Sequence, residues 1–487
     1  MRLPFSGHIT VFVRLPGKRR FFAYIQKGIL MIHKYKALGL NIVMDVYSGV
    51  IHAVDDLVYD MLDHIKDVPE EDKCPGNIVS ALSGKYSAEE IDEAYEEICG
   101  LCENETLFTK DMYSGIAKNW NKKSNIKALC MHITHDCNLR CKYCFADTGA
   151  FHGERSMMSK EVGEKAVDFV IRESGARKNI EIDYFGGEPL LNFDTVRHIT
   201  EYARKKGEEC GKNFRFTITT NGVLLNDEVI SYINENMSNV VLSLDGRKEV
   251  NDRMRYRADG SGSYADIVPK YKKLVESRGD KDYYIRGTFT AENTDFADDV
   301  MHMLDLGFKN TSIEPVVVPE DKQYAVKKED LPAVFAEYDK LARIYYDKRK
   351  NGEPFTFFHF MIDLEQGPCV VKRLSGCGAG HEYVAVTPGG DIYPCHQFVG
   401  NTDFKMGSVF GESIDEGIKE KFERSNVYTK PACENCFAKF YCSGGCSANA
   451  YNFNKDINKP YETACDMERK RVECAVAIEA KLALGDE

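Results

Sequence analysis

Two hydrophobic patterns alternate along the middle of the chain, from residue 128 to about residue 350. Short apolar runs rich in β-branched and aromatic residues predict strands, and longer runs with an apolar residue every three to four positions predict amphipathic helices. The six predicted strands read ALCMHIT, IEIDYF, FRFTIT, VVLSL, YYIRGTFT and TSIEPVV. Repeated strand–helix units predict parallel strands with right-handed crossovers. Six units form an α/β barrel that is incomplete and open on one side, with its functional groups at the carboxyl ends of the strands.

Five helical patterns separate these strands. They read SKEVGEKAVDFVIRES, FDTVRHITEYARKKG, DEVISYINEN, YADIVPKYKKLVES and DFADDVMHMLDLG. Glycine often ends a helix because it adopts the left-handed conformation without strain. We therefore expect the second helix to end at Gly207 and the fifth to end at Gly307.

A smaller module of strands and helices precedes the barrel. Two short strand patterns, HKYKAL and NIVMDVYS, are followed by the helical segments DDLVYDMLDHI and SAEEIDEAYEEICGLC, the second of which is headed by Ser87. This layout resembles a winged helix, a fold that often binds DNA. The acidic helix would repel phosphate groups, however, so a peptide is the better partner.

Composition and charge narrow the class of protein. The chain has 487 residues, is 43% hydrophobic and carries a net charge of -12, which describes a globular protein of several domains. It contains no long basic block and no apolar run long enough to span a bilayer, so we expect neither nucleic acid nor a membrane as a partner. The stretch KRRFF faintly resembles an export signal, but no small-residue cleavage site follows it. We expect a cytoplasmic protein.

Residues 1–30 are expected to be an uncertain extension. Met31 begins a stretch, MIHKYKALGLNIVMDVYSG, that has the form of a natural start. Our hypothesis is that translation begins at Met31. N-terminal sequencing of the native protein tests this hypothesis, and a chain that begins at Met1 would refute it.

Seventeen cysteines are unusual for a chain in the cytosol, where thiols stay reduced and disulfides are rare. Most of them fall into two groups, three within the stretch HDCNLRCKYC and eight in the last quarter of the chain. The others are expected to be small buried residues without a chemical role. These others are Cys74, Cys99, Cys102, Cys130, Cys210 and Cys474.

The first group, Cys137, Cys141 and Cys144, directly follows the strand ALCMHIT. Three thiolates from one short loop hold three irons of a [4Fe-4S] cluster and leave the fourth iron open for an outside ligand. Zinc is the competing interpretation, but a structural zinc site closes with four Cys or His ligands. His135 and His152 are the residues near enough in sequence to complete it. The spacing therefore favours the iron–sulfur cluster.

The loop HDCNLRCKYC resembles the cluster-binding loop of radical S-adenosylmethionine (SAM) enzymes, and the later strand ends match that family as well. The resemblance implies that the open iron is chelated by the amino and carboxylate groups of SAM, whose reductive cleavage gives a 5'-deoxyadenosyl radical. It also implies that Tyr143 packs on the adenine ring. By the same resemblance, the barrel is a partial (β/α)6 TIM-like radical SAM core.

The motif FGGEP follows the second strand and supplies further candidate residues. Gly186 and Gly187 permit close approach of the backbone to a ligand, and the Glu188 carboxylate can bind the methionine ammonium of SAM. Taken alone, the motif is equally well explained as a glycine turn with a solvated glutamate. Its place one strand after the cysteine loop favours the SAM site.

A serine and an arginine complete the expected SAM site. Ser243 lies in SLDG at the end of the fourth strand, and Arg255 follows it in NDRMRYR. The family pattern implies that these residues contact the ribose and the carboxylate of SAM, and a guanidinium suits a carboxylate well. The alternatives are that Arg255 is one of several surface arginines and that Asp245 is a turn residue or a substrate contact.

The C-terminal cysteines resemble the SPASM extension of radical SAM enzymes that modify peptides. The pattern implies two sets of ligands, each for one auxiliary [4Fe-4S] cluster. The first set is Cys433, Cys436, Cys442 and Cys465. The second set is Cys377, Cys395 and Cys446, completed either by Cys369 or by a substrate thiolate at an open position. A zinc ribbon or a redox pair at CENC is the alternative interpretation.

Residues 31–487 are most similar to the thioether-forming maturases of six-cysteine (SCIFF) peptides. The stretches that carry this similarity are MIHKYKALGLNIVMDVYSG, CNLRCKYCFADTGAFHGERSMM and CGAGHEYVAVTPGGDIYPCHQFVGN. The similarity implies a radical SAM oxidoreductase that joins a cysteine sulfur to a residue carbon in a short cysteine-rich precursor peptide. The peptide's leader would dock by adding its backbone to a sheet edge. An electron donor such as ferredoxin or flavodoxin is a further expected partner.

We therefore expect four parts of the chain and two kinds of cofactor. The parts are the uncertain extension 1–30, a leader-recognition module at 31–120, the radical SAM core at 121–350 and the SPASM domain at 351–487. The cofactors are SAM and three [4Fe-4S] clusters, one SAM-binding and two auxiliary. One alternative is an anaerobic sulfatase maturase that forms formylglycine, an enzyme type that generally lacks a leader module. The other is a non-catalytic iron–sulfur electron-transfer protein, which would not need the SAM-binding residues.

Overall fold

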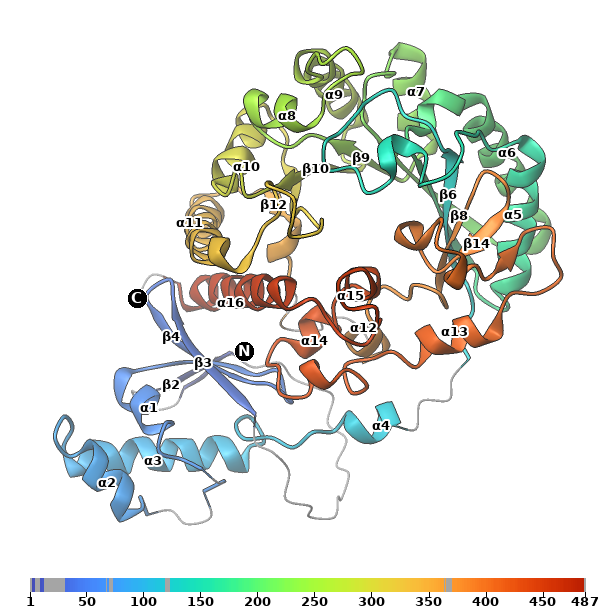
Figure 1. Ribbon diagram of the computed structural model, residues 1–487. Coiled ribbons are helices and arrows are strands. Elements are labelled where there is room, and N and C mark those ends of the chain that lie inside the picture. The colour runs from blue at the N-terminus through green and yellow to red at the C-terminus, as the bar shows by residue number, and fades with distance from the viewer. Residues whose placement is uncertain are drawn as a thin grey trace.

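The computed structural model of the protein describes residues 2–4, 9–12, 31–66, 68–69, 73–118, 123–362, 364 and 370–485. A large, mainly parallel sheet forms a curved wall with helices on its outer face, and a small antiparallel sheet lies at the opposite end of the molecule (Figure 1). The long C-terminal helix α16 (Glu462–Leu484) lies between the two sheets. The N-terminal module, the barrel and the C-terminal region therefore meet at one helix.

The large sheet contains all six strands that the hydrophobic pattern predicts. They are parallel, and each one pairs with the next along the chain. The strands are β6 (Ala128–Thr134), β7 (Asn179–Gly186), β8 (Asn213–Thr220), β9 (Asn239–Ser243), β10 (Asp282–Phe289) and β11 (Asn310–Pro315). The expected α/β fold with a partial barrel is confirmed.

The sheet continues beyond these six strands at both edges, which the sequence did not predict. At one edge the two-residue strand β12 (Thr356–Phe357) pairs parallel with β11. At the other edge β13 (Tyr383–Val386), from the C-terminal region, pairs parallel with β6, and β14 (Asp391–Tyr393) and β15 (Gly407–Ser408) follow it antiparallel. Backbone hydrogen bonds therefore join the C-terminal region to the barrel directly.

Side chains of the parallel strands alternate between the helix-covered outer face and the inner face. In β7, Ile180, Ile182 and Tyr184 are fully buried in the outer core, whereas Asp183 and Phe185 belong to the inner face. Each fully buried apolar side chain contributes about 1.5–3 kcal/mol to folding. The outer face therefore stabilises the barrel, and the inner face is left for polar groups.

Seven helices accompany the parallel strands in the described part of the barrel. They are α5 (Lys160–Glu173), α6 (Phe193–Cys210), α7 (Asp227–Asn236), α8 (Lys248–Met254), α9 (Tyr264–Arg278), α10 (Phe296–Asp305) and α11 (Leu331–Lys350). Five of them match the five helical patterns of the sequence. Helices α8 and α11 were not predicted.

The two expected helix ends had different outcomes. The expected end of α10 is confirmed, because Gly307 follows that helix with a φ of 96°. The expected end of α6 at Gly207 is wrong, since α6 continues to Cys210 and ends at Gly211, whose φ is 67°. Gly207 is needed for packing instead, because a Cβ there would lie 2.6 Å from the carbonyl oxygen of Lys212.

The N-terminal module is an antiparallel sheet with helices packed on one face. Its two expected strands, β3 (Ile32–Ala37) and β4 (Leu40–Asp45), form a hairpin, and the unpredicted strand β5 (Ile51–Val54) pairs with β4. The apolar face of this sheet packs on three helices. These are α1 (Asp56–Met61), α2 (Gly76–Leu82) and α3 (Ala88–Glu103).

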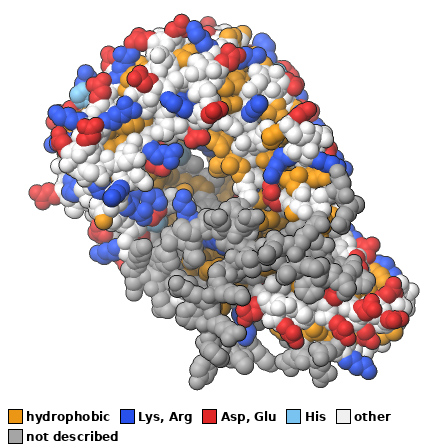
Figure 2. All heavy atoms as spheres, turned by 180° about the vertical axis from the view of Figure 1, so that it is seen from behind, with side chains coloured by type: hydrophobic (Ala, Val, Ile, Leu, Met, Phe, Trp, Pro, Cys, Tyr) orange, Lys and Arg blue, Asp and Glu red, His pale blue; other side chains and the backbone are white. Residues whose placement is uncertain are grey.

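The acidic helix α3 begins where the sequence predicts. The Ser87 hydroxyl accepts a hydrogen bond from the Glu90 N–H, and the Glu90 carboxylate accepts one from the Ser87 N–H. This capping box satisfies two backbone donors at the start of the helix. The other acidic side chains of α3 are exposed except that of Glu97, which is partly buried, and Figure 2 shows red side chains gathered on the lobe that the module forms.

The expected extension at residues 1–30 is described in part. Two short strands, β1 (Arg2–Pro4) and β2 (Ile9–Phe12), extend the module's sheet, with β2 paired antiparallel to β5. The rest of residues 1–30 lies outside the described residues. The sheet order is therefore β1-β2-β5-β4-β3, with β3 at one edge.

Helix α16 packs against the other face of the module's sheet. Tyr35, Ile42 and Met44 from the sheet share a buried apolar cluster with Val472 and Val476 from the helix. At the edge of this contact, His33 Nε2 lies 2.9 Å from Glu473 Oε1. The contact between module and helix is therefore largely apolar.

The cysteines outside the two expected groups are mostly buried. Cys74, Cys99, Cys130 and Cys474 are each less than 10% exposed, as expected. Cys102 is only partly buried, and the expectation is wrong for Cys210, which is exposed near the end of α6.

Among the helices of the described ranges, none is long and apolar enough to cross a membrane.

Candidate functional site

The first three cysteines lie in one loop at the carboxyl end of β6. The Cys144 N–H donates to the Cys141 carbonyl at 3.1 Å, so the loop turns tightly between them. Burial raises the pKa of the Cys137 thiol to about 12, with the charges of Glu188 and the other two thiols acting in the same direction. Burial raises the pKa of Cys141 to about 11. The structure therefore brings three mutually interacting thiols together in a partly buried loop.

The glycines of FGGEP pack against this cysteine loop. A Cβ on Gly186 would lie 2.3 Å from the Thr134 carbonyl oxygen, and a Cβ on Gly187 would lie 2.0 Å from that of Asp136. The Gly187 N–H donates to the Thr134 carbonyl and the Glu188 N–H donates to the Asp136 carbonyl, both at 2.9 Å. These glycines therefore let the FGGEP segment pack closely on the backbone of Thr134 and Asp136. This packing fixes the cysteine loop against the end of β7.

Glu188 is fully buried, which rules out a solvated turn glutamate. Its carboxylate accepts hydrogen bonds of 2.8–3.0 Å from the Leu190 N–H, the Thr220 hydroxyl and the Asn221 N–H. Burial raises the pKa of Glu188 to about 7, although these hydrogen bonds oppose the shift. An ionised carboxylate has about four acceptor positions. One position therefore remains for an ammonium group.

Asn221 is a residue of this site that the sequence did not single out. Its amide donates to Asn138 Oδ1 at 2.7 Å and lies 3.6 Å from Cys137 Sγ. The Leu139 N–H donates to the same sulfur at 3.5 Å. Hydrogen bonds to ligating sulfurs tune iron–sulfur clusters. Asn221 closely follows the third predicted strand, FRFTIT, but nothing in the sequence indicated that its side chain reaches the cysteine loop.

Tyr143 and Arg255 are held by the same carboxylate, that of Asp245. The Tyr143 hydroxyl lies 2.9 and 2.6 Å from the two Asp245 carboxylate oxygens, and Arg255 Nε lies 3.0 Å from one of them. The Arg255 guanidinium is also 5.5 Å from the centre of the Tyr143 ring. Asp245 is fully buried, and the Arg255 side chain is 12% exposed. Arg255 is therefore no surface arginine, and Asp245 anchors two candidate SAM-binding residues.

Ser243 ends β9 on the same rim of the barrel. Its carbonyl accepts a hydrogen bond of 3.0 Å from the Tyr271 hydroxyl. The Tyr271 ring fills the space beside Gly222, where a Cβ would lie 2.2 Å from the ring. Contacts thus run between the loops that follow β6, β7, β8 and β9. The candidate SAM-binding residues therefore share the rim formed by the carboxyl ends of these strands, as a barrel predicts.

The four cysteines of the first C-terminal set lie near one another. Burial, then the charge of Glu468 and then the charges of the other three thiols raise the pKa of Cys442. Burial raises the pKa of Cys465 to about 11, and the charges of Cys433 and Cys436 add to that shift. The Cys436 N–H donates to the Cys433 carbonyl at 3.2 Å. The structure therefore brings this expected set together.

The second C-terminal set lies together as well. Burial raises the pKa of Cys395, followed by the charges of Cys446 and Cys377. Burial also raises the pKa of Cys446, and Cys377 adds to that shift. Gly390 closes the hairpin before Cys395 with a φ of 88°. Cys369, one of the two alternatives for the fourth ligand of this set, lies outside the described residues.

The three cysteine groups suit iron–sulfur clusters chemically, because a [4Fe-4S] cluster holds thiolates at separate corners. Within the described ranges, no group of three His, Cys, Asp or Glu side chains that could hold a single metal ion is found. His135, one of the residues considered for zinc, has its Nε2 3.0 Å from His132 Nδ1.

The inner face of the barrel carries ionisable side chains that the sequence did not single out. Burial raises the pKa of Asp183 on β7 to about 6. Burial lowers the pKa of His396, beside Cys395, to about 4, and the charge of Arg286 on β10 adds to this shift. Strand periodicity shows which residues share a face, but not which faces of different strands meet. His396 and Arg286 were therefore not predictable as neighbours.

A chain of polar contacts links the barrel to α16. His359, in the 3-10 turn η4 (Phe358–Phe360) after β12, has its Nε2 3.1 Å from Glu314 Oε1 and its Nδ1 3.0 Å from an Arg471 guanidinium nitrogen. The charges of His359 and Arg471 hold the pKa of Glu314 well below its usual range, against the effect of burial.

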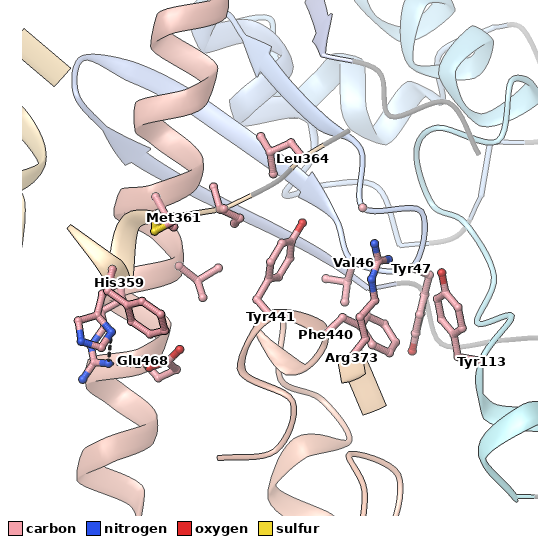
Figure 3. Close-up of a pocket in the computed structure, with 16 residues that line it drawn as sticks. Val46, Tyr47, Tyr113, His359, Met361, Leu364, Arg373, Phe440, Tyr441 and Glu468 are labelled. Carbon is pink, nitrogen blue, oxygen red and sulfur yellow. Dashed lines mark hydrogen bonds and ion pairs between the residues drawn. The ribbon is translucent and has the colours of Figure 1, made fainter. Parts of the chain in front are cut away.

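A cavity of about 440 Å3 lies where the module meets the C-terminal region and η4. Figure 3 shows Tyr441 between two sides of this cavity, with His359 and Glu468 on one side and Arg373, Tyr47 and Tyr113 on the other. Its lining is rich in aromatic rings, and it reaches the His359 contacts that lead to the barrel. The cavity therefore connects the N-terminal module with the end of β11.

Two protein families match parts of this chain. Residues 131–288 match the Radical SAM superfamily, and residues 377–437 match the SPASM iron-sulfur cluster-binding domain. The chain therefore carries a radical SAM domain followed by a SPASM domain. The first match covers β6 to β10 with the cysteine loop, and the second begins at Cys377 and ends just after Cys436. A non-catalytic electron-transfer protein is therefore no longer a suitable interpretation.

Several curated proteins and solved structures are similar to this chain. The cysteine-type anaerobic sulfatase-maturating enzyme of Clostridium novyi (strain NT) is 26% identical over 347 residues, which are 66% of this chain and 89% of that protein. The radical SAM cyclopropyl synthase TigE of Paramaledivibacter caminithermalis is 23% identical over 378 residues, 70% and 72% of the two chains. The structure of native anSMEcpe with bound AdoMet and Kp18Cys peptide superposes with a TM-score of 0.61 at 20% identity, over 74% and 99% of the chains. This last likeness concerns the fold.

Proposed function

We propose that this enzyme installs thioether cross-links, from a cysteine sulfur to a residue carbon, in a ribosomally made cysteine-rich peptide. The observation that carries the proposal is the gathering of ten cysteines into three groups, one on the barrel rim and two in the C-terminal region, beside a separate N-terminal module. A rim site alone would serve any radical SAM reaction. Two further cysteine groups suit a reaction that binds a thiolate and removes an electron.

The residues of the barrel rim have defined roles in this proposal. Cys137, Cys141 and Cys144 would hold a [4Fe-4S] cluster, which with SAM supplies a 5'-deoxyadenosyl radical able to take a hydrogen atom from carbon. Glu188 would bind the SAM ammonium, and Arg255 would bind its carboxylate. Because Asp245 already orients Arg255 and Tyr143, little side-chain freedom is lost when SAM binds.

The substrate cysteine must lose a proton and an electron for the reaction to balance. The new C–S bond replaces one C–H bond and one S–H bond, so one hydrogen atom leaves the carbon, and one proton and one electron leave the thiol. Metal binding deprotonates a thiol. The second C-terminal set, Cys377, Cys395 and Cys446, is our proposed place for the substrate thiolate, with Cys369 as the competing fourth ligand.

The N-terminal module is our proposed site for the peptide leader, within the domain boundaries expected from the sequence. Strand β3 ends the sheet order, and an extended peptide can add to such an edge by backbone hydrogen bonds. The exposed acidic face of α3 favours a leader with basic residues over a nucleic acid. The cavity beside Tyr441 offers a route from the module toward the barrel.

The proposal is tested with a short cysteine-rich peptide encoded beside the gene of this enzyme. Reconstituted enzyme, SAM, peptide and a low-potential reductant are combined without oxygen. We expect the peptide to lose two hydrogen atoms and one alkylatable thiol for each cross-link, with 5'-deoxyadenosine formed alongside. A peptide of unchanged mass, despite steady formation of 5'-deoxyadenosine, would contradict the proposal.

A sulfatase maturase is the second candidate, and the similarity to the Clostridium novyi enzyme favours it. That activity would oxidise a cysteine or serine to formylglycine, which carries an aldehyde. A sulfatase-derived peptide incubated under the same conditions separates the two candidates. An aldehyde that a hydrazide captures, together with loss of the cysteine sulfur, would replace thioether formation as the function.

A further inference from the structure

Lys430 lies between the two groups of C-terminal cysteines. It is only 3% exposed, although lysine is rarely buried. Its Nζ donates a hydrogen bond of 2.8 Å to the carbonyl oxygen of Gly444. Gly444 stands between Cys442, a member of the first C-terminal set, and Cys446, a member of the second. The ammonium is therefore held at the short loop that joins both sets.

The backbone around Lys430 is shaped to hold its side chain there. The Cys433 N–H donates to the Lys430 carbonyl at 2.8 Å, so Lys430 begins the turn that carries Cys433. Gly444 has a φ of 89°, and a Cβ on it would lie 3.2 Å from Lys430 Nζ. Any other residue would be strained at this φ and would crowd the ammonium. The glycine loop therefore fits around a buried cation.

Once the two cysteine sets bind iron, their thiolates supply the charge that compensates this cation. In the described part of the chain no carboxylate pairs with Lys430, and an uncompensated buried ammonium is costly. Burial lowers the pKa of Lys430, and thiolate charges from both sets oppose this shift. They belong to Cys433 and Cys442 of the first set and to Cys446 and Cys377 of the second.

We propose that Lys430 is a redox-tuning residue whose buried ammonium raises the reduction potentials of both auxiliary clusters. This inference rests on the proposed assignment of those clusters to the two cysteine sets. A cluster that takes one electron from a low-potential donor gains one negative charge, and a fixed positive charge nearby stabilises that reduced form. Because thioether formation removes one electron from the substrate, Lys430 makes both sites better electron acceptors.

Lys439 provides a comparison within the same region. It is 2% exposed, and the thiolates near its ammonium, those of Cys436 and Cys433, both belong to the first set. Aromatic rings stabilise its charge at distances of 4.7–5.3 Å from the ring centres. These rings are those of Tyr47, Tyr428 and Phe440. Lys439 therefore faces one cysteine set, whereas Lys430 faces both.

The test is a redox titration of the reconstituted full-length enzyme, followed by electron paramagnetic resonance. Lys430→Met removes the charge at similar volume, and we expect the equilibrium constant for one-electron reduction to fall at least tenfold at both auxiliary clusters. A tenfold change is a shift of about 59 mV to lower potential. Lys439→Met should lower the potential of one auxiliary cluster alone. Neither substitution should move the potential of the rim cluster.

Iron content distinguishes the effect of the Lys430 charge on the potentials from a failure of the variant to assemble its clusters. Unchanged potentials in Lys430→Met at full iron content would overturn the inference, as would a shift at one auxiliary cluster alone. If Lys430→Met assembles less iron, Lys430→Gln, which still donates to Gly444 but carries no charge, takes its place with the same expected shifts. Should both neutral variants lose iron, retention by Lys430→Arg supports the role of the charge and loss in that variant refutes it. Absence of auxiliary iron in the unaltered enzyme would instead refute the cluster assignment.

Discussion

Charged side chains on the barrel rim are bound to other residues of the chain before any ligand arrives. Glu188 accepts three hydrogen bonds, and Asp245 holds both Tyr143 and Arg255. Ligand binding there must add to these contacts or replace them. A rim ordered in advance loses little entropy on binding, but it also makes each residue's contribution depend on its neighbours. Single substitutions at the rim therefore have specific expected effects.

Cys137→Ala should abolish SAM cleavage. The loop would retain only two thiols, and two cannot hold three irons of the rim cluster. The measurement is 5'-deoxyadenosine formed without oxygen under a low-potential reductant. Cys474→Ala, at a buried cysteine of α16 outside all three groups, is the matched control and should retain cleavage. Deoxyadenosine formed at an undiminished rate by the Cys137 variant would refute the rim assignment.

SAM affinity should depend on pH through Glu188. Burial raises the pKa of this carboxyl to about 7, so below pH 7 the ligand-free protein holds it neutral. A neutral carboxyl binds an ammonium poorly, and the affinity should fall by up to about tenfold per pH unit below pH 7. The free energy of unfolding should change with pH in the opposite direction. Because the pKa of Glu188 is higher in the folded state, this carboxyl favours folding at low pH, and its contribution is lost as the pH rises toward 7.

Calorimetry of SAM binding between pH 5.5 and about pH 8 measures this dependence. Glu188→Gln should bind SAM weakly with little change across that range. If the unaltered protein shows the same flat profile, Glu188 does not bind the ammonium.

Asp245→Asn should weaken both the fold and SAM binding. The substitution keeps the shape but leaves Arg255 without its buried counter-charge, and breaking a buried pair in this way costs about 3–5 kcal/mol. Urea unfolding measures the first effect, and calorimetry with SAM measures the second. Asp259→Asn, in an exposed loop after Arg255, should alter neither. Equal stability of the Asp245 variant and the unaltered protein would argue against an anchoring role.

Residues with a chemical signature of their own were predictable, whereas residues defined by their neighbours were not. Short spacing marked the rim cysteines, the resemblance to a family pattern indicated the two C-terminal sets, and the structure brings the members of each group together. Asn221 escaped prediction because an amide after a strand resembles any other turn residue. His359 and Arg471 are separated by more than a hundred residues, and a single sequence carries no sign of their contact.

Among the elements, the apolar strands and helices of the barrel were predicted well because their period fixes one buried face. Strands β12 and β13 were missed because they are short and exist through pairing with β11 and β6. The position of β13 matters for function, since it places the hairpin before Cys395 beside the first barrel strand. The hydrophobic pattern therefore does not predict strands that form only by pairing with a strand distant in the sequence.

The two roles of glycine within helices give a prediction for α6 and α3. Gly207→Ala should destabilise the protein by about 1–3 kcal/mol, because its Cβ would lie 2.6 Å from the Lys212 carbonyl oxygen and overpack the helix end. Gly100→Ala in α3 meets nothing within 4 Å and should stabilise by about 0.5–1 kcal/mol through helix propensity. Urea unfolding of both variants measures the difference. A stabilising Gly207→Ala would show that the helix end relaxes freely.

Across the whole molecule, α16 holds together the three parts that the proposed reaction needs. Its one face packs on the module through Val472 and Val476, while Arg471 reaches the barrel's Glu314 through His359. Cys465 of the first C-terminal set lies in the same helix. A peptide bound at the module would therefore lie near the helix that contacts the barrel and carries Cys465. Iron content per chain therefore tests whether the three cysteine groups all hold clusters in the same molecule.

The enzyme should contain about twelve irons and as many acid-labile sulfides per chain after reconstitution without oxygen. Each of the three cysteine groups would account for about four, so Cys433→Ala should contain about eight and still cleave SAM, because the rim group is intact. Its cross-linking of the peptide should be lost, since the electron has one acceptor fewer. About four irons in the unaltered enzyme would leave only the rim cluster and assign the C-terminal cysteines another role, and zinc in place of iron would overturn the cluster assignment for all three groups.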